Sequence, residues 1–232
     1  MPLPSIIAID GPVASGKTSV GKRLADRLGY LFFDTGAMYR AVTYLALRDL
    51  GAVSNTAAVA ALAWRSHVDV RPAAVGDGRD YTVLAGEPSE DVTWAIRAPE
   101  VEAGVSPVAA IPEVRHCLTE QMRSVGRRGR VVMVGRDIGT VVLPEADLKI
   151  FLTASVETRA QRRFQETQAR GEARDYNEIL ANLRERDQID TLRTVAPLRP
   201  APGAVTLDTT GLDLPGVVRE LEALVLARSE RS

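Results

Sequence analysis

The stretch "IAIDGPVASGKTSVGKRLA" (Ile7–Ala25) joins a short apolar run, a glycine-rich turn and an amphipathic segment. Within it Gly11, Gly16, Lys17 and Thr18 have the spacing G-x-x-x-x-G-K-[ST] of a phosphate-binding loop. Such a loop turns several backbone N–H groups toward one point at the start of a helix, where the helix dipole also favours an anion. Because the motif follows a predicted strand and opens a predicted helix, we expect a nucleoside triphosphate to bind here.

Each residue type in this loop has a physical role. Gly11 and Gly16 allow the chain to bend and to approach phosphates without a Cβ in the way. Lys17 can reach the β- and γ-phosphates, and the Thr18 hydroxyl can bind Mg²⁺. The residues predicted to hold the nucleotide are therefore Gly11, Pro12, Val13, Ala14, Ser15, Gly16, Lys17, Thr18 and Ser19.

Composition excludes several classes of protein. The chain has 232 residues, of which 45% are hydrophobic and 25% charged, as in an ordinary globular protein. Its 29 Lys and Arg balance 30 Asp and Glu, so no overall basic field favours nucleic acid or a membrane surface. The single Cys117 suits a reducing compartment. No secretion signal precedes the first apolar run, and no apolar stretch could span a bilayer, so we expect a cytoplasmic protein.

Strand and helix patterns alternate along most of the chain. Short apolar runs predict five buried strands, at 5–9, 30–33, 131–134, 148–153 and 204–208. Helical patterns lie between them, and this alternation predicts an α/β fold with a doubly wound parallel sheet. Between Val68 and Thr93 the runs are short and separated by "GDGRD", which predicts an antiparallel hairpin inside an insertion.

The loop alone does not distinguish a switch, a motor and a kinase. The chain lacks the N-K-x-D signature of a guanine-specific GTPase and the L-S-G-G-Q signature of a transporter ATPase. It has instead three arginine-bearing segments far from the loop: "DTGAMYR" (34–40), "GRDIGTVV" (135–142) and "RERDQIDTLRTVAPL" (184–198). In the third, Arg186, Asp190 and Arg193 follow at intervals of four and three residues. If the segment is helical, all three share one face, which is either a binding face or an exposed ion-paired face.

Together these segments closely resemble the bacterial cytidylate kinases, within the P-loop nucleoside monophosphate kinases. The resemblance covers most of the chain and includes "IRAPEVEAGVSPVAAIPEVR" and "GRDIGTVVLPEADLKIFLTAS". It implies a five-stranded parallel sheet flanked by helices, an inserted NMP-binding lobe with short antiparallel strands, and a small lid. The implied division of this one domain is a core at about 1–34, 130–154 and 195–232, an insert at 35–129 and a lid at 155–194.

The resemblance also implies residue roles. Thr35, Ser106, Arg115, Asp137 and Arg193 would line the cytosine pocket, Arg186 and Asp190 would hold the ribose, and Arg40 and Arg136 the acceptor phosphate. Arg159, Arg162 and Arg163 fall where the lid closes, and the catalytic residues would be Lys17, Arg136, Arg159 and Arg163. Family members usually carry an acidic residue before Gly135, whereas this chain has Val134.

The activity implied by the resemblance is phosphorylation of CMP and dCMP to CDP and dCDP by ATP with Mg²⁺. The partners would be these small substrates, with no nucleic acid or membrane, and the protein would be a monomer. Two alternatives remain at this point. One is a kinase for another small acceptor, such as UMP or shikimate, and the other is a regulatory or RNA-binding P-loop protein.

Overall fold

The chain folds into two compact units. The computed structural model describes residues 2–73, 76–169 and 171–229. The first unit comprises Met1–Leu28 and Val132–Ser232, and the second comprises Gly29–Val131.

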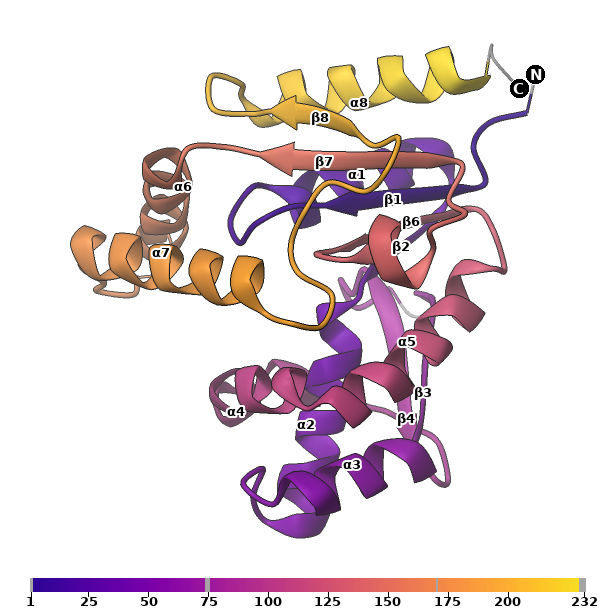
Figure 1. Ribbon diagram of the computed structural model, residues 1–232, viewed down its shortest axis with the longest axis vertical. Helices are drawn as coiled ribbons and strands as arrows, with labels where there is room; N and C mark the ends of the chain where they lie inside the picture. Colours follow the sequence, from indigo (N-terminus) through magenta and orange to yellow (C-terminus); the bar gives the residue numbers. More distant parts are fainter. Residues whose placement is uncertain (1, 74–75, 170, 230–232) are drawn as a thin grey trace. The chain divides into compact units, whose positions relative to one another are not determined.

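The main sheet of the described residues has five strands in the order β2-β6-β1-β7-β8. β1 pairs in parallel with β7, with Ile7 opposite Leu148, and β7 pairs in parallel with β8 (Figure 1). The side chains of β1 are almost all buried, as expected for a central strand of a parallel sheet. The strands are β1 (Ile6–Asp10), β2 (Leu31–Asp34), β6 (Val131–Gly135), β7 (Leu148–Thr153) and β8 (Val205–Asp208).

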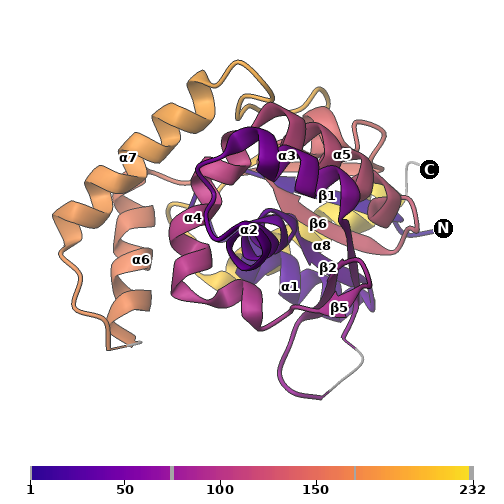
Figure 2. The same cartoon turned by 90° about the horizontal axis from the view of Figure 1, so that it is seen from below.

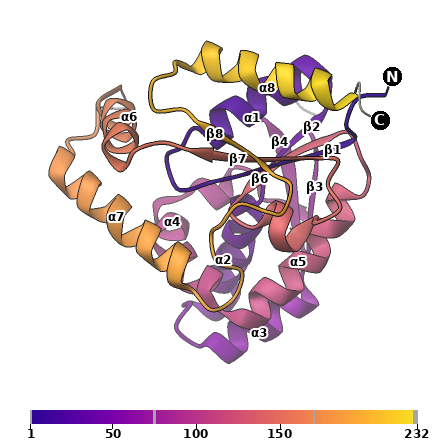
Figure 3. The same ribbon diagram turned by 45° about the horizontal axis from the view of Figure 1, so that its top comes forward.

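Helices of the first unit follow directly from its strands. The loop after β1 leads into α1 (Lys17–Leu28), which packs against α8 (Leu214–Ser229), and Arg27 pairs with Glu222 there. A five-residue π-helix, η2 (Ile138–Val142), follows β6. Helices α6 (Val156–Ala169) and α7 (Tyr176–Leu192) form a hairpin whose contact includes the buried Ala160, Ile179 and Leu183 (Figures 2 and 3).

The second unit combines a small antiparallel sheet with helices. Its strands have the order β3-β4-β5, with Val70 of β3 opposite Val83 of β4. Asn55 caps α3 by accepting a hydrogen bond from the Ala58 amide. The elements are α2 (Gly36–Leu50), α3 (Thr56–Arg65), β3 (His67–Pro72), β4 (Tyr81–Gly86), β5 (Glu90–Asp91), the 3₁₀ turn η1 (Ala95–Arg97), α4 (Pro99–Ala110) and α5 (Pro112–Gly126).

The predicted fold class is confirmed. All five predicted strands are present to within one residue at each end, and the hairpin between Val68 and Thr93 is antiparallel. One prediction of local structure is wrong, because α7 ends at Leu192 and Arg193 has an extended backbone. Arg193 therefore does not share a helical face with Asp190, although the two side chains still meet beyond the helix end.

Candidate active site

The loop between β1 and α1 has the backbone that phosphate binding requires. Gly11 has a φ of +151°, and a Cβ there would lie 2.1 Å from the Leu152 carbonyl oxygen of β7. Gly16 and Ala14 also have positive φ, +91° and +59°. Because α1 begins at Lys17, the amides of its first turn have no acceptors within the helix. The turn therefore presents N–H groups and the positive end of a helix dipole to an anion.

Hydrogen bonds to residues of the loop hold the Lys17 side chain over it. Its Nζ donates to the Pro12 carbonyl oxygen at 2.6 Å and to Ser15 Oγ at 3.4 Å. Ser15 is buried, whereas the Thr18 side chain is exposed on the first turn of α1. The loop thus carries an ammonium group and a hydroxyl beside a row of backbone donors.

A buried carboxylate lies directly before the loop. Asp10, only 3% exposed at the end of β1, accepts hydrogen bonds from two backbone amides of η2. Oδ1 accepts from Ile138 N and Oδ2 from Gly139 N, each at 2.8 Å. The pKa of Asp10 is raised to about 6. Burial is the largest cause and the Asp137 carboxylate also raises it, whereas the hydrogen bonds from Gly139 and Ile138 and the charge of Lys17 lower it. Sequence reasoning missed Asp10; the only signal was an acidic residue ending a buried apolar strand.

Four of the predicted acceptor residues meet in the first unit. Arg136 Nε lies 2.5 Å from Asp190 Oδ2, while Arg193 lies 3.7 Å from both Asp137 and Asp190. Arg193 Nε also donates to the Ala196 carbonyl oxygen at 2.5 Å. Among the described residues, Arg136 Nε, Asp190 Oδ2 and Thr140 Oγ1 are buried without a well-aligned hydrogen bond. The cluster therefore offers buried cationic donors and anionic acceptors to a ligand.

The three predicted lid arginines have different surroundings. The buried Arg159 donates to Asp187 of α7 and to the Val13 carbonyl oxygen of the loop. Arg162 donates to Thr209 Oγ1 at 3.0 Å and to the Thr209 carbonyl oxygen at 2.6 Å, after β8. Arg163 is exposed beside Glu166. These contacts do not gather the three charges at one point.

Two further predicted residues lie at the start of α2 in the second unit. Thr35 is buried at the N-terminus of this helix without a side-chain capping bond. Arg40 donates through Nε and Nη2 to Glu102 Oε2 of α4, at 3.1 and 2.7 Å. Burial is the largest single influence on the pKa of Arg40 and lowers it. The hydrogen bond and charge of Glu102, with smaller contributions from other groups, outweigh burial, so the pKa of Arg40 lies above its usual value.

The remaining predicted residues lie on α4 and α5. Ser106 is exposed on α4, next to Pro107, which stands within that helix. Arg115 of α5 is 8% exposed; its Nη1 donates to the Ala109 carbonyl oxygen at 3.3 Å, and its guanidinium lies 5.6 Å from the centre of the Tyr39 ring. Arg115 is therefore held in one orientation by α4 and α2.

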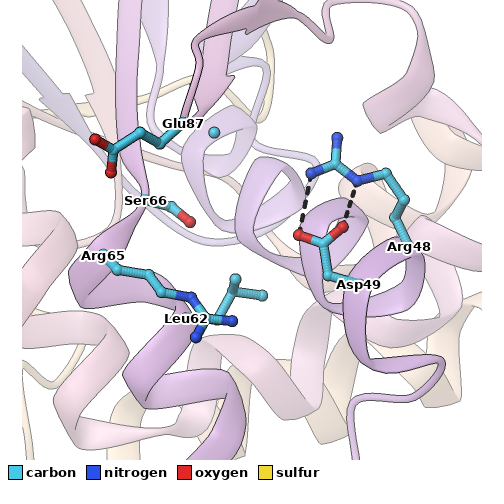
Figure 4. A pocket seen from close by; sticks show the side chains of 7 residues that line it. Arg48, Asp49, Leu62, Arg65, Ser66 and Glu87 are labelled. Carbon is cyan, nitrogen blue, oxygen red and sulfur yellow. Dashed lines mark hydrogen bonds and ion pairs between the residues drawn. The ribbon is translucent and has the colours of Figure 1, made fainter.

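A hollow in the second unit contains none of these residues. Figure 4 shows around it Arg48 and Asp49 of α2, the end of α3 and Glu87. Gly86, the last residue of β4, also lines it. Arg48 and Asp49 form a two-point ion pair there, at 2.5 and 3.0 Å. Arg48 and Asp49 are thus already paired with each other.

The described residues provide neither a cluster of metal ligands nor a membrane-spanning helix. Within residues 2–73, 76–169 and 171–229, no group of three or more His, Cys, Asp or Glu side chains could hold a metal ion. None of the helices described there has the length and apolar character needed to cross a membrane.

A glycine-rich turn between a central parallel strand and a helix, with its lysine over the turn, defines a P-loop nucleotide-binding protein. The arginine–carboxylate cluster after β6 and α7 adds a second polar site in the first unit.

Comparison with known proteins identifies the family. The family model described as cytidylate kinase matches residues 7–226. A cytidylate kinase of Herpetosiphon aurantiacus is 51% identical over 211 residues, covering 91% of this chain and 90% of its own. Cytidylate kinases of Chloroflexus aggregans and Streptococcus mutans are 49% and 45% identical, covering 98% and 93% of this chain and 95% and 93% of theirs. The chain belongs to the cytidylate kinase family.

Proposed function

We propose that this protein transfers the γ-phosphoryl group of ATP to CMP and dCMP, giving ADP with CDP or dCDP. The observation that carries the proposal is the pairing, within one unit, of a phosphate-binding loop with the cluster of Arg136, Asp137, Asp190 and Arg193. Family membership supports the same reaction.

On the donor side, the loop amides and the Lys17 ammonium bind the phosphates of ATP. Thr18 is the proposed protein ligand for Mg²⁺, and an exposed hydroxyl at the start of α1 fits an ion that keeps most of its other ligands as water and phosphate oxygens. Bound there, Mg²⁺ would neutralise charge on the triphosphate.

On the acceptor side, cytosine offers an amino donor beside ring acceptors. Asp137 accepts from the amino group, and an arginine donates to the ring acceptors. The proposed acceptor contacts are, in the first unit, Arg136, Asp137, Arg186, Asp190 and Arg193 and, in the second unit, Thr35, Arg40, Ser106 and Arg115. This set combines arginines, carboxylates and hydroxyls, which are the groups that can bind a phosphate, a sugar and a base.

The chemistry requires no covalent intermediate. An oxygen of the acceptor phosphate attacks the γ-phosphorus, the bond from that phosphorus to the β–γ bridging oxygen breaks, and ADP leaves. Lys17, Arg136, Arg159 and Arg163 are the proposed residues that offset the developing negative charge.

Release of ADP, measured with CMP, dCMP, UMP and AMP as acceptors, tests the proposal. CMP and dCMP should be preferred, because uracil would set a carbonyl oxygen against the Asp137 carboxylate with no proton between them. Asp137→Asn should narrow the preference for CMP over UMP, because an amide can donate to uracil. Equal kcat/KM for CMP and UMP in the wild-type protein would refute the proposed base recognition. ADP release unaffected by any acceptor would refute the reaction and favour a regulatory P-loop protein.

We also propose that the protein acts as a cytoplasmic monomer. Its single cysteine suits a reducing compartment. A mass near 25.1 kDa in light scattering is expected, and a stable dimer would contradict the monomer.

A further inference from the structure

Asp10 has no part in the reaction as proposed, yet its carboxylate joins the two polar sites of the first unit. We propose that Asp10 is a positioning residue: by binding the first two amides of η2 it fixes the turn that carries Asp137 and so directs the Asp137 carboxylate toward the cytosine amino group. This inference rests on the proposed function, since it concerns how the acceptor base is recognised.

The backbone of Asp10 is fixed from two directions. Asp10 is the last residue of β1 and lies opposite Phe151 of β7 in the parallel ladder. The next residue, Gly11, lies so close to the Leu152 carbonyl oxygen that a Cβ would be only 2.1 Å from it. The carboxylate therefore projects from a part of the sheet that has little freedom to move.

The two hydrogen bonds to Asp10 also fix the first turn of η2. Ile138 N and Gly139 N follow Asp137 directly, and each donates to a different oxygen of Asp10 at 2.8 Å. Two bonds to two oxygens of one carboxylate set the direction of the turn as well as its position. Gly139 is also tightly packed, because a Cβ there would lie 3.1 Å from side-chain atoms of Ala201 and Lys149.

Asp137 occupies the N-cap position of η2 but makes no capping bond with its side chain. An aspartate at an N-cap ordinarily accepts from the amide two or three residues further on, which here belongs to Gly139 or Thr140. Asp10 instead accepts from the amides of Ile138 and Gly139, and Asp137 Oδ2 lies 3.7 Å from Arg193 Nη2. A carboxylate from another strand thus binds one of the two amides that Asp137 could cap.

Asp10→Asn should weaken the contact between β1 and η2. An amide has one acceptor oxygen, and its NH₂ group would face a backbone N–H, so one amide of η2 loses its partner. Asp137 can then turn to cap its own helix. We expect KM for CMP to rise about tenfold, the equivalent of one strong hydrogen bond. The preference for CMP over UMP should fall by a similar factor, while KM for ATP changes less than about threefold.

Asp147→Asn is the matched control. Asp147 Oδ2 accepts from Ser5 N and Ile6 N at 2.9 Å each, at the opposite end of the same strand. Both variants remove a carboxylate that binds two backbone amides beside β1, but only Asp10 contacts η2. The measurements are kcat and KM with CMP, UMP and ATP, calorimetric binding of CMP, and thermal melting.

Loss of CMP affinity and of base preference in Asp10→Asn, but not in Asp147→Asn, would support the inference. The double variant with Asp137→Asn should lose no more preference than Asp137→Asn alone, because Asp10 acts through Asp137. A folded Asp10→Asn protein with the KM and CMP-to-UMP ratio of Asp147→Asn would overturn the inference. If the Asp10→Asn protein does not fold, the same measurements are made on Asp10→Glu. If neither variant folds, the positioning role is overturned and Asp10 contributes to stability alone. A wild-type protein that does not phosphorylate CMP would instead refute the proposed function.

Discussion

Arg159 and Asp187 form a two-point ion pair between α6 and α7, with Nη1 to Oδ1 at 3.0 Å and Nη2 to Oδ2 at 2.5 Å. The same guanidinium donates from Nη1 to the Val13 carbonyl oxygen and from Nε to the Ala154 carbonyl oxygen, each at 3.1 Å. One buried side chain therefore links the end of β7, the phosphate-binding loop and α7. Any movement of α7 has to act on this contact.

Asp187→Ala should destabilise the protein by about 1–3 kcal/mol, because it leaves the buried Arg159 charge without its carboxylate. Asp187 keeps 27% of its side chain exposed, which places the expected loss below that of a fully buried pair. KM for ATP should also rise, since Arg159 orients the Val13 carbonyl. Melting curves and ATP kinetics measure both effects.

Glu157→Ala provides the comparison for that variant. Glu157 pairs with Arg184 between the same two helices at 3.1 Å, but both side chains are more than half exposed, so its loss should cost under about 1 kcal/mol. Equal melting temperatures for the two variants would show that the Arg159 pair contributes no more than a surface contact.

Gly11→Ala should prevent stable folding or lower stability by more than about 3 kcal/mol, because the new Cβ meets backbone rather than a side chain that can move aside. Gly78→Ala separates this clash from backbone strain. Gly78 also has a positive φ, +85°, but nothing lies within 4 Å of a Cβ there, so it should cost only about 1–2 kcal/mol. Chemical unfolding of both variants measures the difference, and similar losses would contradict the clash.

Strand positions were predictable because each buried strand is a short apolar run flanked by turn residues, as in β7. The end of α7 was not. Spacing alone continued the helix through Arg193, whereas the chain turns at Ala196, whose φ is +53°, and Leu198 N returns to the Asp190 carbonyl oxygen. That turn depends on contacts made only after the chain has folded back over the helix end.

Contacts between distant segments also could not be predicted from the sequence. The bonds of Asp10 to η2 join residues about 128 apart, and Arg159 meets Asp187 across 28 positions. The strand β1 and the helices α6 and α7 could be predicted, whereas η2 was not. In no case does the sequence state which side chain of one element contacts the other. The loop itself was predictable because its chemistry is local, with strand, glycines, lysine and helix in one continuous stretch.

Lys17→Ala should reduce turnover by at least about 100-fold without unfolding the protein, because it removes the ammonium directed at the phosphates. The fold should survive, since the hydrogen bonds of Lys17 Nζ to the Pro12 carbonyl oxygen and Ser15 Oγ lie within the loop and join no separate elements of the fold. Arg23→Ala, which removes an exposed positive charge from the same helix, is the control and should retain activity. Near-normal turnover in folded Lys17→Ala protein would contradict the role of the loop.

The raised pKa of Asp10 leads us to expect that a rise in pH lowers its contribution to stability but increases the preference for CMP over UMP. Its pKa is raised from 3.8 to about 6, so the folded state holds the proton more tightly than the unfolded state. The stabilising contribution is therefore complete below about pH 4 and is lost as pH rises through about 6. Preference for CMP over UMP should instead fall as pH drops through 6, because a protonated Asp10 loses an acceptor for η2.

Kinetics between pH 5.5 and 8 measure this, and the CMP-to-UMP ratio cancels the titration of the substrate phosphate. The charged groups facing Asp10 are Lys17 and Asp137, so Asp10→Asn identifies which part of the profile belongs to Asp10. A ratio that does not change with pH in the wild-type protein, or that changes equally in the variant, would assign the titration to another group.

Asp190→Ala tests whether the cluster after α7 binds the acceptor or is only an ion pair. Asp190 lies 2.5 Å from Arg136 and 3.7 Å from Arg193, with 14% of its side chain exposed. If its carboxylate accepts from a sugar hydroxyl, the charge-assisted bond is worth about 1.5–3 kcal/mol, and KM for CMP should rise about tenfold or more. Removal also leaves Arg136 and Arg193 without the anion between them, which should add to the loss. KM for ATP should stay within about twofold.

An ion pair without a binding role would give a different result. Because the pair is largely buried, removing Asp190 would then cost stability, up to about 3–5 kcal/mol for a fully buried pair, and would lower the melting temperature. Acceptor kinetics of the folded variant would change little. Steady-state kinetics with CMP and dCMP, beside melting curves for Asp190→Ala and for the exposed Glu157→Ala, distinguish the two cases. A wild-type KM for both acceptors would remove Asp190 from the binding site and leave it as the partner of Arg136.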